Sequence, residues 1–193
     1  MLFRSDLVVF GRRAGGAAAT YARELKSAPR IPDAEVEDEA RDLVAPFERT
    51  SGESPFEVHQ ALQQCMNDLV GIFRTDKELE RALEELAGLE ARAARVRIEG
   101  TRLYNPGWHL CRDLRNMIVV SEAITRSALL RKESRGAHSR LDYPSPDPAL
   151  GKVNVSCVKS GETMKTHLTP LPEMPAELER LFEPAPQPAG AKA

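Results

Sequence analysis

The residue types best suited to chemistry gather in one short segment, RKESRGAHSRLDYPSPD, at residues 131–147. Glu133, Arg135, His138 and Arg140 lie close together in it. An arginine binds a carboxylate through two parallel hydrogen bonds, and a histidine titrates near neutral pH. One interpretation is therefore that Arg135 and His138 bind a carboxylate or complete a surface for a partner.

The same segment follows a leucine-rich stretch that is typical of a helix, and this position suggests a second interpretation. Positive side chains near a helix C-terminus interact favourably with the helix dipole and can cap the last carbonyl groups. In that case Glu133, Arg135, His138 and Arg140 belong to a solvated helix end. We favour this interpretation, because the rest of the chain offers no partner groups for catalysis.

No other combination of residues predicts a reactive site. His59, His109, His138 and His167 lack the spacings of a metal site, and no carboxylate completes a ligand set. His109 and Cys111 would lie on different faces of a helix, which argues against a cysteine nucleophile. The chain has no glycine-rich loop of the nucleotide-binding kinds, and we interpret the run GRRAGG as close helix packing. We therefore predict no catalytic, cofactor-binding or metal-binding residue in this chain.

The composition indicates a chain that can form its own hydrophobic core and has no strong overall electrostatic field. It has 193 residues, 41% of them hydrophobic, and 27 Lys and Arg against 29 Asp and Glu give a net charge of −2. This balance argues against nucleic acid as a partner, and no apolar run approaches the ~20 residues of a membrane helix. Cys65, Cys111 and Cys157 are interpreted as packing residues in a reduced, cytoplasmic setting.

Capping signals and hydrophobic spacing predict the elements that position these residues. Residues 5–25 have small side chains at helical spacing and need a close neighbour, and an amphipathic stretch follows Pro32. Further helices begin at three cap signals, SPFE at residues 54–57, TDKE at 75–78 and NP at 105–106, and the last runs to about Lys132. The predicted buried positions are Val58, Leu62, Cys65 or Met66, Leu69 and Phe73, then Leu79, Leu83, Leu86 and Leu89, then Trp108, Cys111, Leu114, Ile118, Ser121, Ile124 and Ala128.

Two β-rich pieces flank Ser160 and Gly161 and predict a hairpin. The fold class predicted is mainly α: a bundle of about three long helices, preceded by an orphan helix and followed by the hairpin and a disordered tail. The expected divisions are residues 1–30 for the orphan helix, 31–145 for the helical domain, 146–183 for the hairpin and a short helix, and 184–193 for the tail.

The order of the segments SDLVVFGRRAG, ALQQCMNDLVGIFR and NPGWHLCRDLRNMIVVSEAITRSALLRKESRGAHSRLDYP resembles the C-terminal part of a known flavoprotein. It is similar to the flavoprotein subunit of succinate dehydrogenase and fumarate reductase, whose superfamily includes L-aspartate oxidase. The resemblance runs from about Ser5 to Phe182. The runs MNDLVGIFR and ESRGAHSRLDYP make it specific.

The resemblance implies an oxidoreductase in which FAD, bound covalently, passes electrons between a dicarboxylate and an iron–sulfur subunit. The family's flavin-binding and substrate-binding residues precede the point where this sequence starts, so none has a counterpart here. Residues 1–30 would then be the final helix of the FAD-binding domain. Arg135, His138 and Arg140 would be interdomain contacts, because this segment would lie where the helical domain meets the flavin domain.

Two functions follow from the resemblance. The first is a fragment of the oxidoreductase subunit that is not catalytic alone, contains no FAD, and has the flavin-binding domain and the iron–sulfur subunit as partners. The alternative is a free-standing helical interaction or assembly module that docks on a flavoprotein or iron–sulfur subunit. In both cases we expect a cytoplasmic location without membrane insertion, peripheral to the inner membrane if the chain assembles in a complex.

Overall fold

The computed structural model describes residues 5–182, which divide into two units, residues 5–44 and 45–182. Each unit is considered by itself. The predicted disordered tail at residues 184–193 lies outside the described residues. The expected domain boundaries at residues 30, 145 and 183 stay predictions.

The first unit consists of helix α1 (Ser5–Glu24) and most of helix α2 (Asp33–Glu48), which continues into the second unit. Residues 6–24 are all exposed, including Leu7, Val8 and Phe10. A side chain at Gly11 or Gly15 would meet no atom within 4 Å. The small face of α1 is therefore open, and the close neighbour that its sequence predicts stays a prediction.

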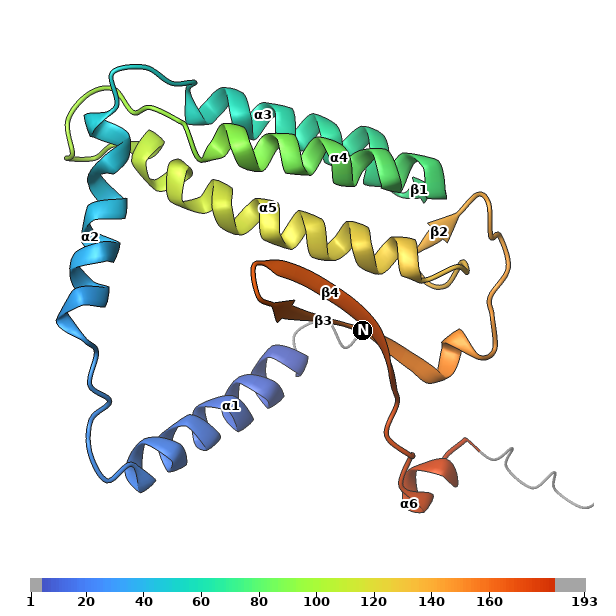
Figure 1. Cartoon of the computed structure of the whole chain (residues 1–193). Helices are drawn as coiled ribbons and strands as arrows, with labels where there is room; N and C mark the ends of the chain where they lie inside the picture. Colours follow the sequence, from blue (N-terminus) through green and yellow to red (C-terminus); the bar gives the residue numbers. More distant parts are fainter. Residues whose placement is uncertain (1–4, 183–193) are drawn as a thin grey trace, which may run out of the picture. The chain divides into compact units, whose positions relative to one another are not determined.

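The second unit is built on three helices that lie side by side, α3 (Pro55–Cys65), α4 (Asp76–Ala93) and α5 (Pro106–Leu130) (Figure 1). Each begins at its predicted cap. Ser54 and Glu57 form a complete capping box, Thr75 accepts from the backbone of Glu78, and Asn105 accepts from that of Trp108. Such caps satisfy N–H groups that have no partner within the helix.

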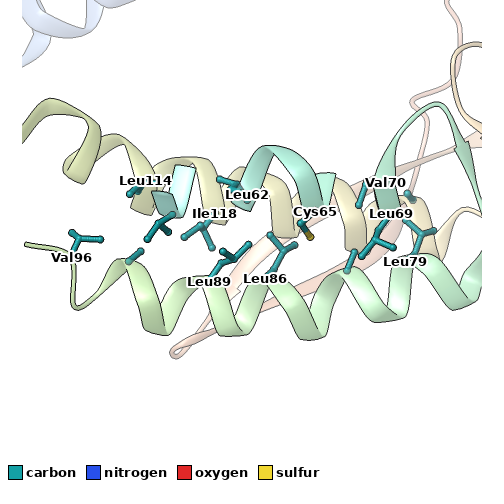
Figure 2. Close-up of a cluster of buried hydrophobic side chains, with 14 residues drawn as sticks. Leu62, Cys65, Leu69, Val70, Leu79, Leu86, Leu89, Val96, Leu114 and Ile118 are labelled. Atoms are coloured by element: carbon teal, nitrogen blue, oxygen red, sulfur yellow. The ribbon is translucent and has the colours of Figure 1, made fainter. Parts of the chain in front are cut away.

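The hydrophobic core lies between these three helices (Figure 2). The predicted stripes are largely confirmed, but Phe73 is 66% and Ile124 44% exposed, and Leu83 is only half-buried. Cys65 is buried and Cys111 half-buried, whereas Cys157 is exposed, so its prediction as a packing residue was wrong. The buried apolar side chains are Val58, Leu62, Cys65, Leu69, Val70, Leu79, Ala82, Leu86, Leu89, Ala93, Val96, Ile98, Leu114, Ile118 and Ala128.

The stripe on α3 stops early because the helix widens. A single π-helical turn, η1 (Met66–Val70), follows α3 and leads into the short strand β1 (Phe73–Arg74). A π-helical turn changes the angle between successive side chains, so the spacing that placed Phe73 inside no longer applies. Strand β1 pairs in parallel with β2 (Ser139–Arg140), from the segment after α5.

The predicted hairpin is present as strands β3 (Val153–Ser160) and β4 (Thr163–Pro170), which are antiparallel. Ser160 pairs with Thr163, and Gly161 between them has φ +62°, a conformation that glycine adopts without strain. A short 3₁₀ helix, η2 (Leu150–Lys152), precedes the hairpin, and α6 (Ala176–Glu179) follows it. The mainly α fold class with a hairpin is therefore confirmed.

None of the helices in residues 5–182 has the length and apolar character needed to cross a membrane.

We expect Leu86→Ala to lower the free energy of unfolding by about 2–5 kcal/mol, because it leaves a cavity in the core. Leu86 is 2% exposed and lies between the three helices. Leu103→Ala is the matched control, since Leu103 is 76% exposed, and its effect should stay within about 0.5 kcal/mol. Urea denaturation followed by circular dichroism measures both. Equal effects of the two variants would contradict the assignment of the core.

Candidate functional site

Residues 131–147, here called the charged loop, fold back over the C-terminal end of α5. Two local devices shape the loop. Arg135 and His138 exchange backbone hydrogen bonds of 2.8 and 3.0 Å across a tight turn at Gly136, whose φ is +59°. The Ser134 hydroxyl donates to the carbonyl of Tyr143 at 2.9 Å and accepts from the Arg140 backbone N–H at 2.8 Å.

Arg140 lies at the centre of this arrangement and is only 1% exposed. Its guanidinium donates two parallel hydrogen bonds of 2.8 Å to Asp142 and one of 2.5 Å to Asp76. A fourth, of 2.7 Å, reaches the Ala128 carbonyl in the last turn of α5. The Tyr143 ring centroid is 5.0 Å from the guanidinium carbon, within reach of a cation–π interaction. One side chain therefore joins α4, α5 and the charged loop.

The two carboxylates beside Arg140 also act on the start of α4. Asp142 accepts a 2.7 Å hydrogen bond from the backbone N–H of Asp76, the first residue of that helix. Hydrogen bonds from Arg140 lower the pKa of Asp142 to about 2. Burial raises the pKa of Asp76, but hydrogen bonds from Arg140 and Lys132 outweigh it, so the net pKa is lowered. Both carboxylates are therefore ionised at neutral pH, where they suit the positive end of the helix dipole.

Glu133 forms a second buried charge cluster and has a fully buried side chain. It accepts hydrogen bonds from Arg131, from Arg135 at 3.1 and 3.2 Å, and from the Asp147 backbone N–H at 2.7 Å. The Arg135 hydrogen bonds, with those from Asp147 and Arg131, overcome the effect of burial and lower the pKa of Glu133 to about 2. Arg131 also donates to the Leu150 and Val153 carbonyls, which ties the cluster to the start of the hairpin.

His138 connects the charged loop to strand β1. Its Nδ1 lies 2.8 Å from Nη1 of Arg74, and its Nε2 lies 2.9 Å from the Arg131 carbonyl oxygen. A guanidinium only donates and a carbonyl only accepts, so Nδ1 accepts and Nε2 carries the proton. Burial lowers the pKa of His138, and the nearby arginines act in the same direction. The imidazole is therefore neutral and has both nitrogens engaged.

The structure thus brings together Arg135, His138 and Arg140, the three contact residues that the sequence suggested, but gives them different surroundings. His138 and Arg140 bind carbonyl groups at the end of α5, an arrangement that the helix-end interpretation expects. The expectation of a solvated end is wrong for Glu133 and Arg140, which are buried, while Arg135 stays exposed. The role of Arg135, His138 and Arg140 as interdomain contacts stays a prediction.

Sequence reasoning missed the partners that lie far away along the chain. Arg74 lies in β1 and Asp76 is the first residue of α4, each 64 positions along the chain from a partner in the charged loop. Asp142 was missed as well, although it lies just after Arg140. The one available signal was the run RTD at residues 74–76, which places two charged residues around the Thr75 cap. Within residues 5–182, no cluster of three or more His, Cys, Asp and Glu side chains could hold a metal ion. The arrangement supplies rigidity and charge, and it presents no nucleophile beside a base.

Comparison with known proteins gives a consistent match. Residues 59–184 match the family model described as fumarate reductase flavoprotein C-term. The fumarate reductase flavoprotein subunit of Mycobacterium tuberculosis H37Rv is 36% identical over 149 residues, which cover 74% of this chain and 26% of that protein. The succinate dehydrogenase flavoprotein subunit of Coxiella burnetii is 34% identical over 75% of this chain and 25% of its own length.

A solved structure shows the same fold at higher identity. Mycobacterium smegmatis Sdh1 in complex with UQ1 superposes with a TM-score of 0.86 and 45% sequence identity, covering 93% of this chain and 31% of that chain. The chain spans about a quarter of the length of the curated relatives it matches.

We expect Arg140→Ala to lower the free energy of unfolding by about 3 kcal/mol or more, because it leaves carboxylates and a carbonyl without their charged partner. Arg140→Lys should recover only part of this loss, since an ammonium cannot make the two parallel bonds to Asp142. Arg81→Ala is the control, because Arg81 is 68% exposed in its pair with Glu85 and should cost less than about 1 kcal/mol. Chemical denaturation at pH 7 measures the free energy of unfolding of each variant. If all three variants were as stable as the wild type, the role of Arg140 would be contradicted.

Glu133 should make the stability of the chain depend on pH below about 5. Its folded-state pKa of about 2 lies below the unfolded value near 4.3, so the unfolded chain binds more protons as the pH falls between them. The stabilisation is therefore complete above the unfolded pKa and is lost toward pH 2. We expect Glu133→Gln to be less stable than the wild type at pH 7, with the difference shrinking at pH 3.

Urea titrations at pH 7, 5 and 3 measure this difference directly. Glu99→Gln controls for loss of a surface carboxylate, because Glu99 is 78% exposed in its pair with Arg97. A gap between wild type and Glu133→Gln that stays constant from pH 7 to pH 3 would show that the Glu133 charge is not what stabilises the loop.

Proposed function

The chain belongs to the family of fumarate reductase flavoprotein C-terminal domains, and from this premise we propose that it serves as the C-terminal helical domain of a succinate dehydrogenase or fumarate reductase flavoprotein. The match of residues 59–184 to the family model is the observation that carries the proposal. In this role the chain supplies a rigid packing surface. The flavin-binding domain holds FAD and the dicarboxylate, and electrons pass on to an iron–sulfur subunit.

The surface beside the charged loop is the part of the chain that we propose contacts the flavin-binding domain. Ile72, Phe73 and Leu141 are 71%, 66% and 64% exposed. These three residues lie close together, because the Leu141 N–H donates to the Arg74 carbonyl at 2.9 Å and β1 pairs with β2. Exposed apolar groups that cluster in this way are typical of interaction sites. We call Ile72, Phe73, Arg135 and Leu141 the loop-end surface.

Within this proposal the three predicted contact residues have different tasks. Arg135 is exposed and is available to a partner directly, although it also pairs with Glu133. His138 and Arg140 act from inside: their hydrogen bonds to Arg74, Asp76 and the end of α5 hold β1 and β2 in place. The interdomain contact would therefore depend on all three, with Arg135 alone of the three at the surface.

Helix α1 fits the same proposal as the last helix of the flavin-binding domain. Its exposed Leu7, Val8, Phe10 and Tyr21 and the open space at Gly11 and Gly15 are the features of a helix that packs closely against other elements. Glycines disfavour an isolated helix by about 1 kcal/mol each relative to alanine, so such a helix needs a neighbour.

The test is reconstitution with a succinate dehydrogenase flavoprotein whose own C-terminal helical domain has been removed. We expect the isolated chain to show no flavin absorbance after incubation with FAD and gel filtration. Mixed with the shortened flavoprotein, it should bind saturably. It should also raise succinate oxidation with an oxidised dye as electron acceptor, or fumarate reduction with a reduced dye as electron donor. A flavin band on the isolated chain would contradict the proposal, and so would a failure to bind the shortened protein.

The loop-end surface is tested in the same assay. Phe73→Glu should weaken binding at least about tenfold, the equivalent of 1.4 kcal/mol, by placing a charge in an apolar contact. Phe56→Glu is the matched control, because Phe56 is 54% exposed at the beginning of α3, away from β1. Binding to an iron–sulfur subunit alone, unaffected by Phe73→Glu, would instead support the alternative of a free-standing interaction module.

A further inference from the structure

The second unit has a cavity near the C-terminal end of α4 that the proposed packing role does not use. It measures about 420 Å³ and is lined by Arg49, Ser51, Gly52, Glu53, Arg92 and Arg95. Three guanidinium groups thus face a single carboxylate. Pockets for small ligands commonly have volumes of about 300–1,000 Å³, so this one has room for a small organic molecule.

The walls of the cavity are fixed by bonds between the loop after α2 and the segment after α4. The Arg97 N–H donates to the Glu53 carbonyl at 2.9 Å, and Arg49 donates to the Val96 carbonyl at 2.5 Å. Arg92 and Glu53 form a two-point ion pair, with 2.9 Å between Nε and Oε2. The Arg92 hydrogen bonds lower the pKa of Glu53, so this pair stays ionised at neutral pH.

Gly52 allows the two segments to approach this closely. Its φ is +153°, and a Cβ at this position would stand 2.4 Å from the Arg95 carbonyl oxygen. A side chain there would push the loop away from α4 and open the wall of the cavity. The shape of the cavity therefore depends on the backbone conformation at Gly52 as well as on the long side chains that line it.

The arginines that line the cavity keep most of their hydrogen-bonding capacity. A guanidinium has five N–H donors. Arg49 uses one on Val96, and Arg95 uses one on the Ala91 carbonyl at 3.1 Å, whereas Arg92 is neutralised by Glu53. These hydrogen bonds to carbonyl groups hold both arginine side chains near the C-terminal end of α4, where the helix dipole favours positive charge. A carbonyl group carries no net charge, so it does not neutralise Arg49 or Arg95. Arg49 and Arg95 thus keep N–H donors beside Ser51, and three guanidinium groups around the single Glu53 carboxylate leave a net positive charge. This combination suits an anion with more than one oxygen.

We propose that this cavity, formed by Arg49, Ser51, Gly52, Arg92 and Arg95, binds a small multivalent oxyanion, a polycarboxylate or a phosphate compound. Arg49 and Arg95 bind the charged groups through paired N–H donors, and the Arg92–Glu53 pair forms a fixed wall. The site lies within the second unit and is independent of whether the chain packs on a flavin-binding domain.

Titration calorimetry on the full chain tests the site with two probes, citrate and inorganic phosphate, at constant ionic strength. Citrate should bind saturably, and Arg95→Ala should weaken it at least tenfold. Because Arg95 is exposed and makes one hydrogen bond, this variant should fold. Ser51 is exposed, so Ser51→Asp should fold, and it should abolish binding by adding a negative charge. Arg81→Ala on α4 is the control.

The two probes identify the kind of ligand. Tighter binding of citrate supports a polycarboxylate, and equal or tighter binding of phosphate supports a phosphate compound; both results support the site. Backbone amide shifts in a nitrogen-15 NMR titration should centre on Ser51 and Gly52. The proposal is overturned if neither probe saturates, if Arg81→Ala weakens binding as much as Arg95→Ala, or if only a long acidic peptide binds.

Discussion

The second unit depends on the burial of one positive charge, the guanidinium of Arg140. A guanidinium that is 1% exposed can stay in the interior only with charged and hydrogen-bonding partners close by. Those partners are Asp76 at the start of α4, the Ala128 carbonyl at the end of α5, and Asp142 in the charged loop. A shift of any one element would take one of these partners away from the buried charge. The interaction therefore fixes three elements relative to one another, which apolar packing alone would specify less strictly.

The parts of this fold that the sequence predicts are those set by neighbouring residues. The capping box at Ser54 and the cap at Asn105 each use groups within three or four residues of each other, so the spacing alone identifies them. The hairpin follows from Gly161 between two β-rich segments in the same way. Arg140 and Asp76 are 64 positions apart, and no local pattern pairs an arginine with one of many distant carboxylates.

The misplaced Phe73 shows how a local irregularity defeats a periodic rule. A spacing of three or four residues assumes an unbroken α-helix, and the π-helical turn η1 breaks it after Cys65. Arg74 then donates to the Val70 and Gly71 carbonyls at 2.7 and 2.8 Å, which takes up groups that the ending helix leaves open. The chain leaves as a strand, and Phe73 points outward. The predicted buried stripe was correct as far as Leu69, which lies within the turn.

The buried charge clusters and the exposed apolar groups beside them are structurally linked. Buried ion pairs contribute little net stability compared with apolar packing, so an end of the bundle held by Arg140 and Glu133 is costly for stability alone. What such a network supplies is a defined shape, because each charge accepts only a few arrangements of its neighbours. Ile72, Phe73 and Leu141 lie on the strands that this network holds. A rigid apolar surface loses less freedom on binding than a mobile one. In the proposed packing role, the buried charges would therefore favour a partner that fits the loop-end surface in one orientation.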